Sequence, residues 1–554
     1  MSQSAIKGSA FYQIYPRSFC DTNKDGIGDL NGITQKLDYV ASLGVDGIWI
    51  SPFFTSPMKD FGYDVSDYRD IDPIFGTLAD FDSLLDKAHD LNLKIIIDLV
   101  LSHTSDQHPW FTGKPEYYVW ENPKIELSSR RKPGSHKHSN QIPDQVRDDV
   151  KGQKPNNWVS VFGGPAWTWH DGRGQYYLHN FLPQQPDLNF HNQDVQNEAL
   201  DIAKFWLERG VDGFRLDVVN FYFHDQQLRD NPPRDESMGA ATQFEGDDPY
   251  SQQHHVFDKS RPENLDFLRR FQSLCDQYSA FTIGEIGDDH PDERSAEYTA
   301  PGLLNTCYNT GMMAGAHKKL TADIIREPIE SFYDSVKKQS SLPHGDGVRG
   351  RGHSGHPHPN PQGAGCPAWA FSNHDVVRAA SRWLADSDGF SHDPKLSKML
   401  IALLGCLPGC LFLYQGEELG LPEAKLAFED LQDPWGKHLY PAWQGRDGCR
   451  TPMPWTDQKP LNSWLPMPDA HVPLNIEKQN KDENSTLNFT RRFLAWRKTQ
   501  DPLLWGNITF GDRKETTLTF TRRYKDRETQ CHFDLKTYDF SVSGFSSKGG
   551  SPSD

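Results

Sequence analysis

The chain has 554 residues, enough for one large domain with smaller appendages. Its net charge of −18 and its scattered Lys and Arg residues argue against nucleic acid or an anionic membrane as a partner. We find no apolar run of about eighteen residues, so we expect no membrane-spanning helix. The N-terminus lacks an apolar signal core and the eight cysteines lack paired spacing, which favours a reducing cytoplasm.

Short apolar runs alternate with segments of helical periodicity along most of the chain. We expect, in chain order, strands at 11–15 and 45–51, a helix at 81–91, a strand at 93–101, a helix at 197–209, a strand at 211–216, a helix at 264–279, strands at 281–286 and 368–371, a helix at 394–407 and a strand at 410–414. Repeated βα units favour an α/β fold, the (β/α)₈ or TIM barrel. A doubly wound sheet is the alternative, but no Gly-rich phosphate loop follows the first strand.

Residues 104–180 are aromatic, polar and Pro-rich and interrupt this alternation, as expected of a loop domain inserted after the third strand. Within it, residues 124–154 are charged and predict a flexible flap. A short β domain with a strand at 516–521 is expected at the C-terminus. The predicted domains are a barrel of residues 1–103 and 181–500, an insertion of residues 104–180 and a C-terminal domain of residues 501–554.

A second polar stretch, residues 340–365, is rich in histidine. A metal site is conceivable there, but the spacing favours a solvated linker. The histidines are His344, His353, His356 and His358.

Three apolar, strand-like runs each end on a carboxylate, at Asp217, Glu285 and Asp375. A single Asp after a strand is usually a helix cap. Three in order, with Arg215 before the first and His374 beside the last, indicate instead a shared site at the carboxyl ends of one sheet. Cleavage of a glycosidic bond requires such a pair of carboxylates, one acting on the sugar and one on the leaving group.

Five segments resemble motifs of the α-amylase family (glycoside hydrolase family 13), in the branch of oligo-1,6-glucosidases and α-glucosidases. The match runs from about residue 11 to residue 496. The segments are DLVLSH (98–103), QPDLN (185–189), GFRLDVVN (213–220), GE (284–285) and FSNHD (371–375). The resemblance implies that Asp217 is the nucleophile and Glu285 the general acid and base, with Arg215 keeping Asp217 ionised. It also implies retention of configuration, with the two carboxylates about 5–5.5 Å apart.

The resemblance further implies a closed sugar pocket. Asp375 is expected to bind sugar hydroxyls, and His103 and His374 to donate hydrogen bonds to the terminal glucose. Asp64 is expected to grip that glucose and to pair with Arg446, although Arg450 is close enough in sequence to take the place of Arg446. The rings expected to stack on sugars are Tyr63, Phe162 and Phe181.

The segment 21–29 reads DTNKDGIGD and places oxygen side chains at alternate positions before a glycine. This pattern suits a hard cation, although Gly32 stands where a true EF-hand loop has glutamate. A structural Ca²⁺ or Mg²⁺ is therefore expected, and no organic cofactor. The expected ligands are the side chains of Asp21, Asn23, Asp25 and Asp29 and the carbonyl of Ile27.

The expected substrates are small α-glucosides, cleaved one glucose at a time, with transglucosylation as a side activity. The resemblance associates valine after the nucleophile, here Val218, with cleavage of α-1,6 linkages. The residues of the other motifs instead resemble those of enzymes that cleave α-1,4 maltosides. Two alternatives are an α-glucosyl isomerase or transferase, such as a trehalulose-forming enzyme, and a non-catalytic family member. The second is disfavoured because all three carboxylates are present. We expect a monomer or a weak homodimer.

Overall fold

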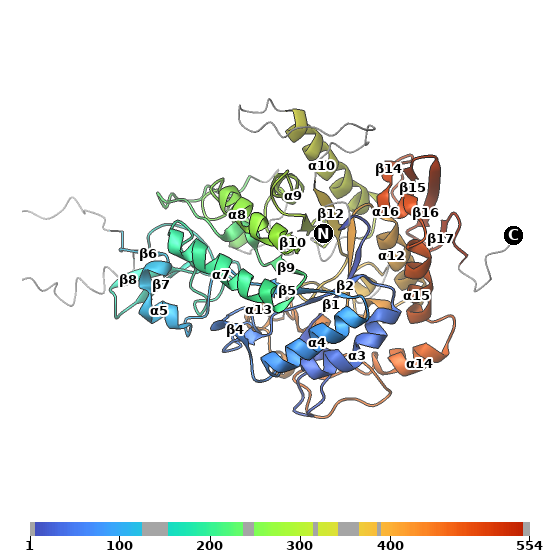
Figure 1. Cartoon of the computed structure of the whole chain (residues 1–554), viewed down its shortest axis with the longest axis horizontal. Coiled ribbons are helices and arrows are strands. Elements are labelled where there is room, and N and C mark those ends of the chain that lie inside the picture. Colours follow the sequence, from blue (N-terminus) through green and yellow to red (C-terminus); the bar gives the residue numbers. More distant parts are fainter. Residues whose placement is uncertain are drawn as a thin grey trace, which may run out of the picture.

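The computed structural model describes residues 6–124, 153–235, 249–313, 319–341, 365–384, 389–441 and 443–546. Eight parallel strands form a closed barrel in the order β1-β13-β12-β11-β10-β9-β5-β2 (Figure 1). This confirms the predicted (β/α)₈ architecture. The strands are β1 (Ala10–Ile14), β2 (Gly47–Ile50), β5 (Lys94–Leu99), β9 (Gly213–Leu216), β10 (Phe281–Glu285), β11 (Thr306–Asn309), β12 (Cys366–Trp369) and β13 (Cys410–Tyr414).

Helices surround the barrel and bury their apolar faces against it, as the alternation of helix and strand patterns predicts. The α-helices of the described residues, not all of which pack on the barrel, are α2 (Pro16–Phe19), α3 (Leu30–Ser42), α4 (Leu78–Asp90), α5 (Pro109–Gly113), α7 (Gln193–Arg209), α8 (Asn264–Gln277), α9 (Pro291–Tyr298), α10 (Ala322–Ser341), α11 (Ala379–Arg382), α12 (Pro394–Cys406), α13 (Pro434–Leu439), α14 (Ile476–Lys481), α15 (Thr486–Arg497) and α16 (Asp501–Trp505).

Capping explains where the predicted helix boundaries differ from the structure. Helix α7 begins four residues before the predicted start because the Asn192 side chain accepts a hydrogen bond from the N–H of Asp194. It ends at Gly210, whose φ of 104° lies in the left-handed region that favours glycine. Strand β11 was not predicted, because its sequence, TCYN, contains no aliphatic run.

Three smaller sheets accompany the barrel. Strands β6 (Trp120–Glu121), β8 (Gln175–Leu178) and β7 (Trp167–His170) form one antiparallel sheet between β5 and α7 in the chain. Strands β14 (Asn507–Phe510), β15 (Thr517–Tyr524), β16 (Arg527–Asp534) and β17 (Phe540–Val542) form a second, and β3 (Phe54–Thr55) and β4 (Asp67–Ile71) a third. In Figure 1 the β14–β17 sheet lies near α12 and α16, at the opposite side from β6–β8.

Two predicted segments fall largely outside the described residues, namely the flap at 124–154 and the histidine-rich stretch at 340–365. All eight cysteines are described and none forms a disulfide. Among the described helices, we find none with the length and apolarity needed to cross a bilayer.

Candidate active site

The guanidinium of Arg215 lies at the centre of the site. Residues two apart on a strand point to the same side, so Arg215 and Asp217, at the end of β9, both face the barrel mouth. Arg215 Nη1 lies 2.5 Å from Asp217 Oδ1, and Nη2 lies 2.7 Å from Glu285 Oε2. One fully buried cation therefore holds both carboxylates that the sequence singled out.

Parallel pairing explains how residues so distant in sequence meet. Strand β9 pairs with β5 on one side and with β10 on the other. In that register Asp98 lies opposite Arg215, and Arg215 Nη1 lies 2.7 Å from Asp98 Oδ1. Because parallel strands end at the same edge of a sheet, Asp217 and Glu285 project from neighbouring carboxyl ends.

Burial sets the protonation of the two carboxylates. It raises the pKa of Glu285 to about 7, an effect that Arg215 opposes and the nearby charge of Asp217 reinforces. Burial also raises the pKa of Asp217 to about 7. Arg215 favours ionised Asp217, as expected, but burial outweighs it. At neutral pH the coupled pair can therefore hold a single proton.

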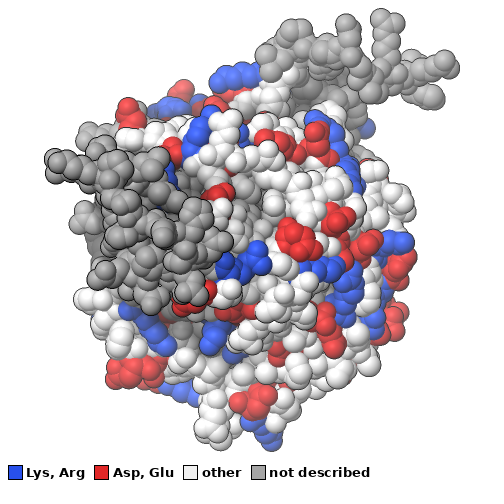
Figure 2. All heavy atoms as spheres, turned by 90° about the vertical axis from the view of Figure 1, so that its left-hand side faces the viewer, with Lys and Arg blue, Asp and Glu red and all other residues white. Residues whose placement is uncertain are grey.

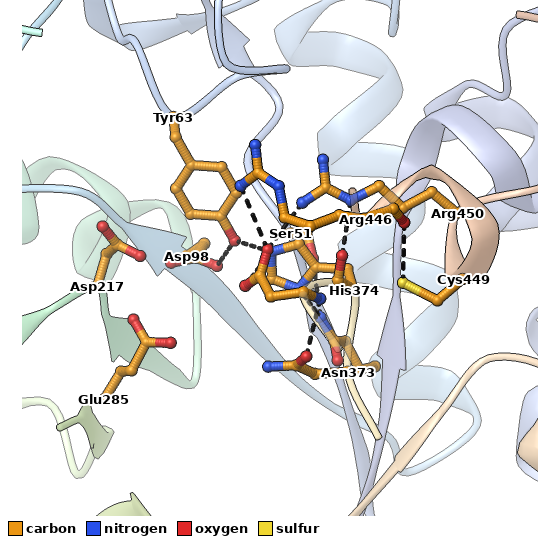
Figure 3. A network of polar contacts seen from close by, with 12 residues as sticks. Ser51, Tyr63, Asp98, Asp217, Glu285, Asn373, His374, Arg446, Cys449 and Arg450 are labelled. Atoms are coloured by element: carbon orange, nitrogen blue, oxygen red, sulfur yellow. Dashed lines mark hydrogen bonds and ion pairs between the residues drawn. The ribbon is translucent and has the colours of Figure 1, made fainter. Parts of the chain in front are cut away.

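Each of the two carboxylates keeps one oxygen without a protein partner. Glu285 Oε2 is bound by Arg215 and by the backbone N–H of Val218 at 3.1 Å. Among the described residues, neither Glu285 Oε1 nor Asp217 Oδ2 accepts a hydrogen bond. One oxygen of each side chain is thus oriented by the protein, and the other accepts no hydrogen bond from the described residues. Figure 3 shows both side chains beside Tyr63 and Asp98.

Asp375 is held by a second group of charges on the same side of the barrel, and His374 links this group to Tyr63. Arg450 Nη2 lies 2.7 Å from Asp375 Oδ1, and Arg446 Nη1 lies 3.4 Å from the same oxygen. Burial alone would raise the pKa of Asp375, but His374 and the two arginines lower it well below its usual range. Asp375 is therefore ionised at pH values at which Glu285 still holds a proton.

Tyr63 and His374 form a stacked pair beside the carboxylates (Figure 3). Their ring centroids lie 5.4 Å apart with an interplanar angle of 4°. Tyr63 Oη lies 2.6 Å from His374 Nε2 and donates to Asp98 Oδ2 at 3.1 Å. Burial lowers the pKa of His374 to about 3, so the ring is neutral at pH 7.

The predicted pair of Asp64 and Arg446 is wrong. Arg446 Nη2 instead lies 2.8 Å from Asp60 Oδ1 and 2.8 Å from Asp433 Oδ1. The carboxylate of Asp64 is turned into its own loop, where it accepts the N–H of Asp60 at 2.9 Å and that of Lys59 at 2.8 Å. Asp64 thus orders the loop, and Asp60 is the residue that reaches the arginine.

The two arginines weighed from the sequence both lie in the site. Arg446 links Asp60 to Asp375, whereas Arg450 donates from Nε to the carbonyl of His374 at 2.6 Å and from Nη2 to Asp375. The two arginines therefore have different roles. Arg446 joins two loops, and Arg450 holds the FSNHD segment in place.

Gln185 connects His103 to Asp60. Its Nε2 lies 3.1 Å from His103 Nε2 and donates to Asp60 Oδ2 at 3.2 Å. Burial lowers the pKa of His103 to about 4, so this ring is also neutral at pH 7. The QPDLN and DLVLSH segments thus meet in space.

Phe162 and Phe181 are half-buried rings at the same place. Phe181 lies 5.2 Å from the His103 ring and 5.6 Å from Phe162. The guanidinium of Arg446 lies 5.1 Å above the Phe162 ring. Every residue predicted for the substrate pocket therefore lies in or directly beside one network.

Asp60, Gln185 and Asp98 are the site residues to which the sequence alone assigned no role. Asp98 lies in the DLVLSH motif and Gln185 in the QPDLN motif, and their presence in these motifs could have marked them as site residues. Asp60 stands four residues before Asp64 in the same loop, so only the path of the loop distinguishes the two.

The predicted cation loop forms a tight turn in which side-chain oxygens accept hydrogen bonds from the loop's own backbone N–H groups. Asp21 accepts the N–H of Gly26 at 2.9 Å, and Asp25 accepts that of Ile27 at 2.8 Å. Gly26 has φ of 95°, which suits the sharp bend of a cation loop. Asp29 instead caps α3 through the N–H of Gly32 at 2.6 Å.

The carboxylate oxygens of Asp21 and Asp25 fit a hard cation in their chemistry, because each accepts one hydrogen bond and retains a further lone pair. Both oxygens of Asp29 already accept two hydrogen bonds each, from Thr22 and Gly32. Within the described ranges, no three His, Cys, Asp or Glu side chains converge as a ready-made metal cage.

Two carboxylates at the carboxyl ends of a (β/α)₈ barrel share one guanidinium and are bordered by neutral histidines and aromatic rings, an arrangement that suits cleavage of a glycosidic bond. The α-amylase catalytic-domain profile matches residues 13–348 and 352–506. The chain belongs to the α-amylase family, glycoside hydrolase family 13.

Individual relatives agree with this assignment. A probable α-glucosidase of Rhizobium meliloti (strain 1021) is 46% identical over 545 residues, which cover 96% of this chain and 89% of the relative. An oligo-1,6-glucosidase of Parageobacillus thermoglucosidasius is 33% identical over 538 residues, covering 90% and 84%. The crystal structure of the α-glucosyl transfer enzyme XgtA superimposes with a TM-score of 0.83 at 46% identity, covering 96% and 91%. The protein is a glycoside hydrolase of the α-glucosidase type.

Proposed function

We propose that this protein is an exo-acting, retaining α-glucosidase that releases glucose from short α-glucosides through a β-glucosyl-enzyme intermediate. The observation that carries the proposal is the pair of carboxylates held on Arg215, each with one oxygen available to a substrate.

In the first step, an Asp217 oxygen attacks the anomeric carbon while the bond to the leaving oxygen breaks. That oxygen takes the proton of Glu285. In the second step, Glu285 removes a proton from water, which attacks the anomeric carbon and releases Asp217. A sugar hydroxyl that replaces water in this step gives transglucosylation.

We propose that Asp60 and Arg446 close the pocket and bind the non-reducing end of the glucose. Their contact joins the loop after β3 to the segment after α13, and Gln185 and His103 extend it. Asp375 and His374 would bind ring hydroxyls, with Tyr63, Phe162 and Phe181 as apolar walls. A pocket closed at this end admits one glucose unit, which makes the enzyme exo-acting.

Because Asp60 contacts Arg446 and Asp64 contacts its own loop, we expect two matched variants to differ in their effect on activity. Asp60→Asn removes a charge beside the sugar and weakens the buried ion pair with Arg446, and we expect kcat/KM to fall about 100-fold with some loss of stability. Asp64→Asn replaces an acceptor of three loop hydrogen bonds, and we expect it to lower stability by about 1–3 kcal/mol. Steady-state kinetics and thermal melts on both variants separate these roles. A larger kinetic loss in Asp64→Asn at equal stability would contradict the assignment.

The substrate linkage is tested by measuring glucose release from maltose and isomaltose side by side, with proton NMR of the first product anomer. We expect α-glucose as the first product anomer, which indicates retention of configuration. A preference for isomaltose would indicate that Val218 determines the linkage. A preference for maltose would indicate that the other motifs are the better guide. First release of β-glucose would overturn the two-step mechanism.

A transferase is the second candidate, and the similarity to the α-glucosyl transfer enzyme XgtA favours it. The chemistry is shared up to the glucosyl ester, so only the acceptor differs. Product analysis with maltose plus an added alcohol distinguishes them, since a transferase forms mainly alkyl glucoside.

We further propose that the 21–29 loop binds a structural Ca²⁺ or Mg²⁺ through Asp21, Asn23, Asp25, the Ile27 carbonyl and Asp29. The alternating oxygens and the bend at Gly26 support this proposal. If the ion is present at about 100 times its dissociation constant, chelation should cost about 2.7 kcal/mol of stability. Thermal melts with EDTA, then with added Ca²⁺ or Mg²⁺, measure it. Asp25→Asn should remove the response, and an unchanged melting temperature in EDTA would contradict the proposal.

We also propose a cytoplasmic enzyme that acts as a monomer or weak homodimer on neutral sugars. The unpaired cysteines support a reducing compartment. Among the described residues on the face shown in Figure 2, acidic and basic side chains are interspersed and form no single-sign patch that would favour a charged polymer. Light scattering after size-exclusion chromatography measures the oligomeric state.

A further inference from the structure

A buried amide joins the two loops that carry the catalytic pair. Asn220 lies three residues after Asp217, and Gly287 lies two residues after Glu285. Asn220 Nδ2 donates to the carbonyl of Gly287 at 2.9 Å, and the N–H of Gly287 donates to Asn220 Oδ1 at 3.1 Å. The side chain therefore closes a two-bond ring with the backbone of the other loop.

The remaining hydrogen of that amide is also used. Asn220 Nδ2 donates to Ser260 Oγ at 2.9 Å, and the N–H of Ser260 donates to the carbonyl of Asn220 at 2.6 Å. Ser260 Oγ in turn donates to Asp288, next to Gly287. Asn220 is fully buried, so these bonds do not compete with water. Only asparagine supplies two donors and one acceptor at this reach, because aspartate lacks the donors and glutamine is longer.

The segment between Asp217 and Asn220 is conformationally unusual. Val218 has φ of 33° and ψ of 52°, a left-handed conformation that a β-branched residue rarely adopts. Such a conformation persists only where surrounding contacts determine it. It directs the N–H of Val218 to Glu285 Oε2 at 3.1 Å, the same oxygen that Arg215 binds. The turn that Asn220 fastens thus orients the proposed acid directly.

We infer that Asn220 is a positioning residue, which sets the placement of Glu285 relative to Asp217 by clamping the loop after β9 to the loop after β10. This inference rests on the proposed roles of the two carboxylates. Its consequence is specific: loosening the clamp should impair the donation of a proton to the leaving group more than the binding of the sugar.

The test compares Asn220→Ala with wild type on two substrates. Maltose has a poor leaving group and needs the acid, whereas α-glucosyl fluoride needs little protonation. We expect kcat/KM on maltose to fall about 100-fold, as misplacement of a catalytic group by about 1 Å can do. On α-glucosyl fluoride we expect less than about a tenfold loss of kcat/KM, because this quantity reports the first step and not the second step, in which Glu285 acts as base on both substrates.

A matched control is Asn305→Ala. Asn305 is also a buried asparagine that bridges neighbouring barrel strands, and its Oδ1 accepts the N–H of Thr282 at 3.0 Å near the start of β10. We expect it to lower the melting temperature and to leave both substrates with near wild-type kcat. Equal losses on both substrates in Asn220→Ala, or unchanged kinetics, would overturn the inference.

Two further variants keep the test decisive if Asn220→Ala does not fold. Asn220→Asp keeps the shape and the acceptor but loses both donors, and should show the same maltose-selective loss. Ser260→Ala leaves the ring with Gly287 intact and should lose less activity than Asn220→Asp; an equal or larger loss would overturn the role of the ring. Glu285→Gln tests the proposed function separately: if it cleaves maltose at the wild-type rate, the acid role itself is wrong, whatever the Asn220 variants do.

Discussion

Asp217→Asn should lower kcat on maltose by about 10⁴-fold or more, the scale of loss when an enzyme loses its covalent nucleophile. The amide keeps the shape of the carboxylate but cannot form the glucosyl ester. Arg215 retains Asp98 and Glu285 as partners, so the variant should fold. Activity is measured by glucose release and the fold by circular dichroism and thermal melts.

Asp212→Asn is the matched control for this variant. Asp212 stands just before β9, five residues before Asp217, and lies 2.8 Å from Lys94 Nζ and 2.7 Å from His89 Nε2. It should lose some stability and keep its kcat. If Asp217→Asn retained a tenth or more of wild-type turnover, Asp217 would not be the nucleophile.

Glu285→Gln should lower kcat on maltose by about 10²–10⁴-fold, the usual contribution of a general acid. The same change should remove the alkaline limb of the wild-type pH profile. Burial raises the pKa of Glu285 to about 7, and the first step requires the protonated form. The wild-type rate should therefore fall as pH rises through the neutral range, whereas a glutamine has no proton to lose.

The measurement is kcat/KM for maltose and for α-glucosyl fluoride across pH 5 to about 9, a span that brackets the pKa values of the pair. In Glu285→Gln, kcat/KM for α-glucosyl fluoride should fall much less than kcat/KM for maltose, because fluoride needs little protonation to leave in the first step. Because the two carboxylates interact, the wild-type limbs report on the pair and not on one residue. An alkaline limb that stays unchanged in Glu285→Gln would show that another group is the acid.

The barrel was predictable because its signal is local. Buried parallel strands such as β5, with the sequence KIIIDL, are apolar runs, and the helices between them carry their own periodicity and caps. The three carboxylates proposed for catalysis were singled out for the same reason. Asp217 follows β9, Glu285 ends β10 and Asp375 lies shortly after β12, and parallel strands end at one edge of the sheet. Strand β11 was missed because it has neither signal.

The sequence by itself determined the fold class and the residues that carry the proposed chemistry, namely Asp217, Glu285 and Asp375. Only the tertiary structure decided how the pocket around them is closed. Asp60 and Asp64 are both loop aspartates, and no pattern says which one faces Arg446.

The backbone between these two aspartates decides the matter. Phe61 has φ of 54° and Gly62 has φ of 109°, so two successive left-handed residues reverse the chain. This turn directs the Asp64 carboxylate onto the loop's own N–H groups and leaves Asp60 facing Arg446, which lies almost four hundred residues away in the chain. Such a contact depends on the packing of distant loops, for which local sequence carries no signal.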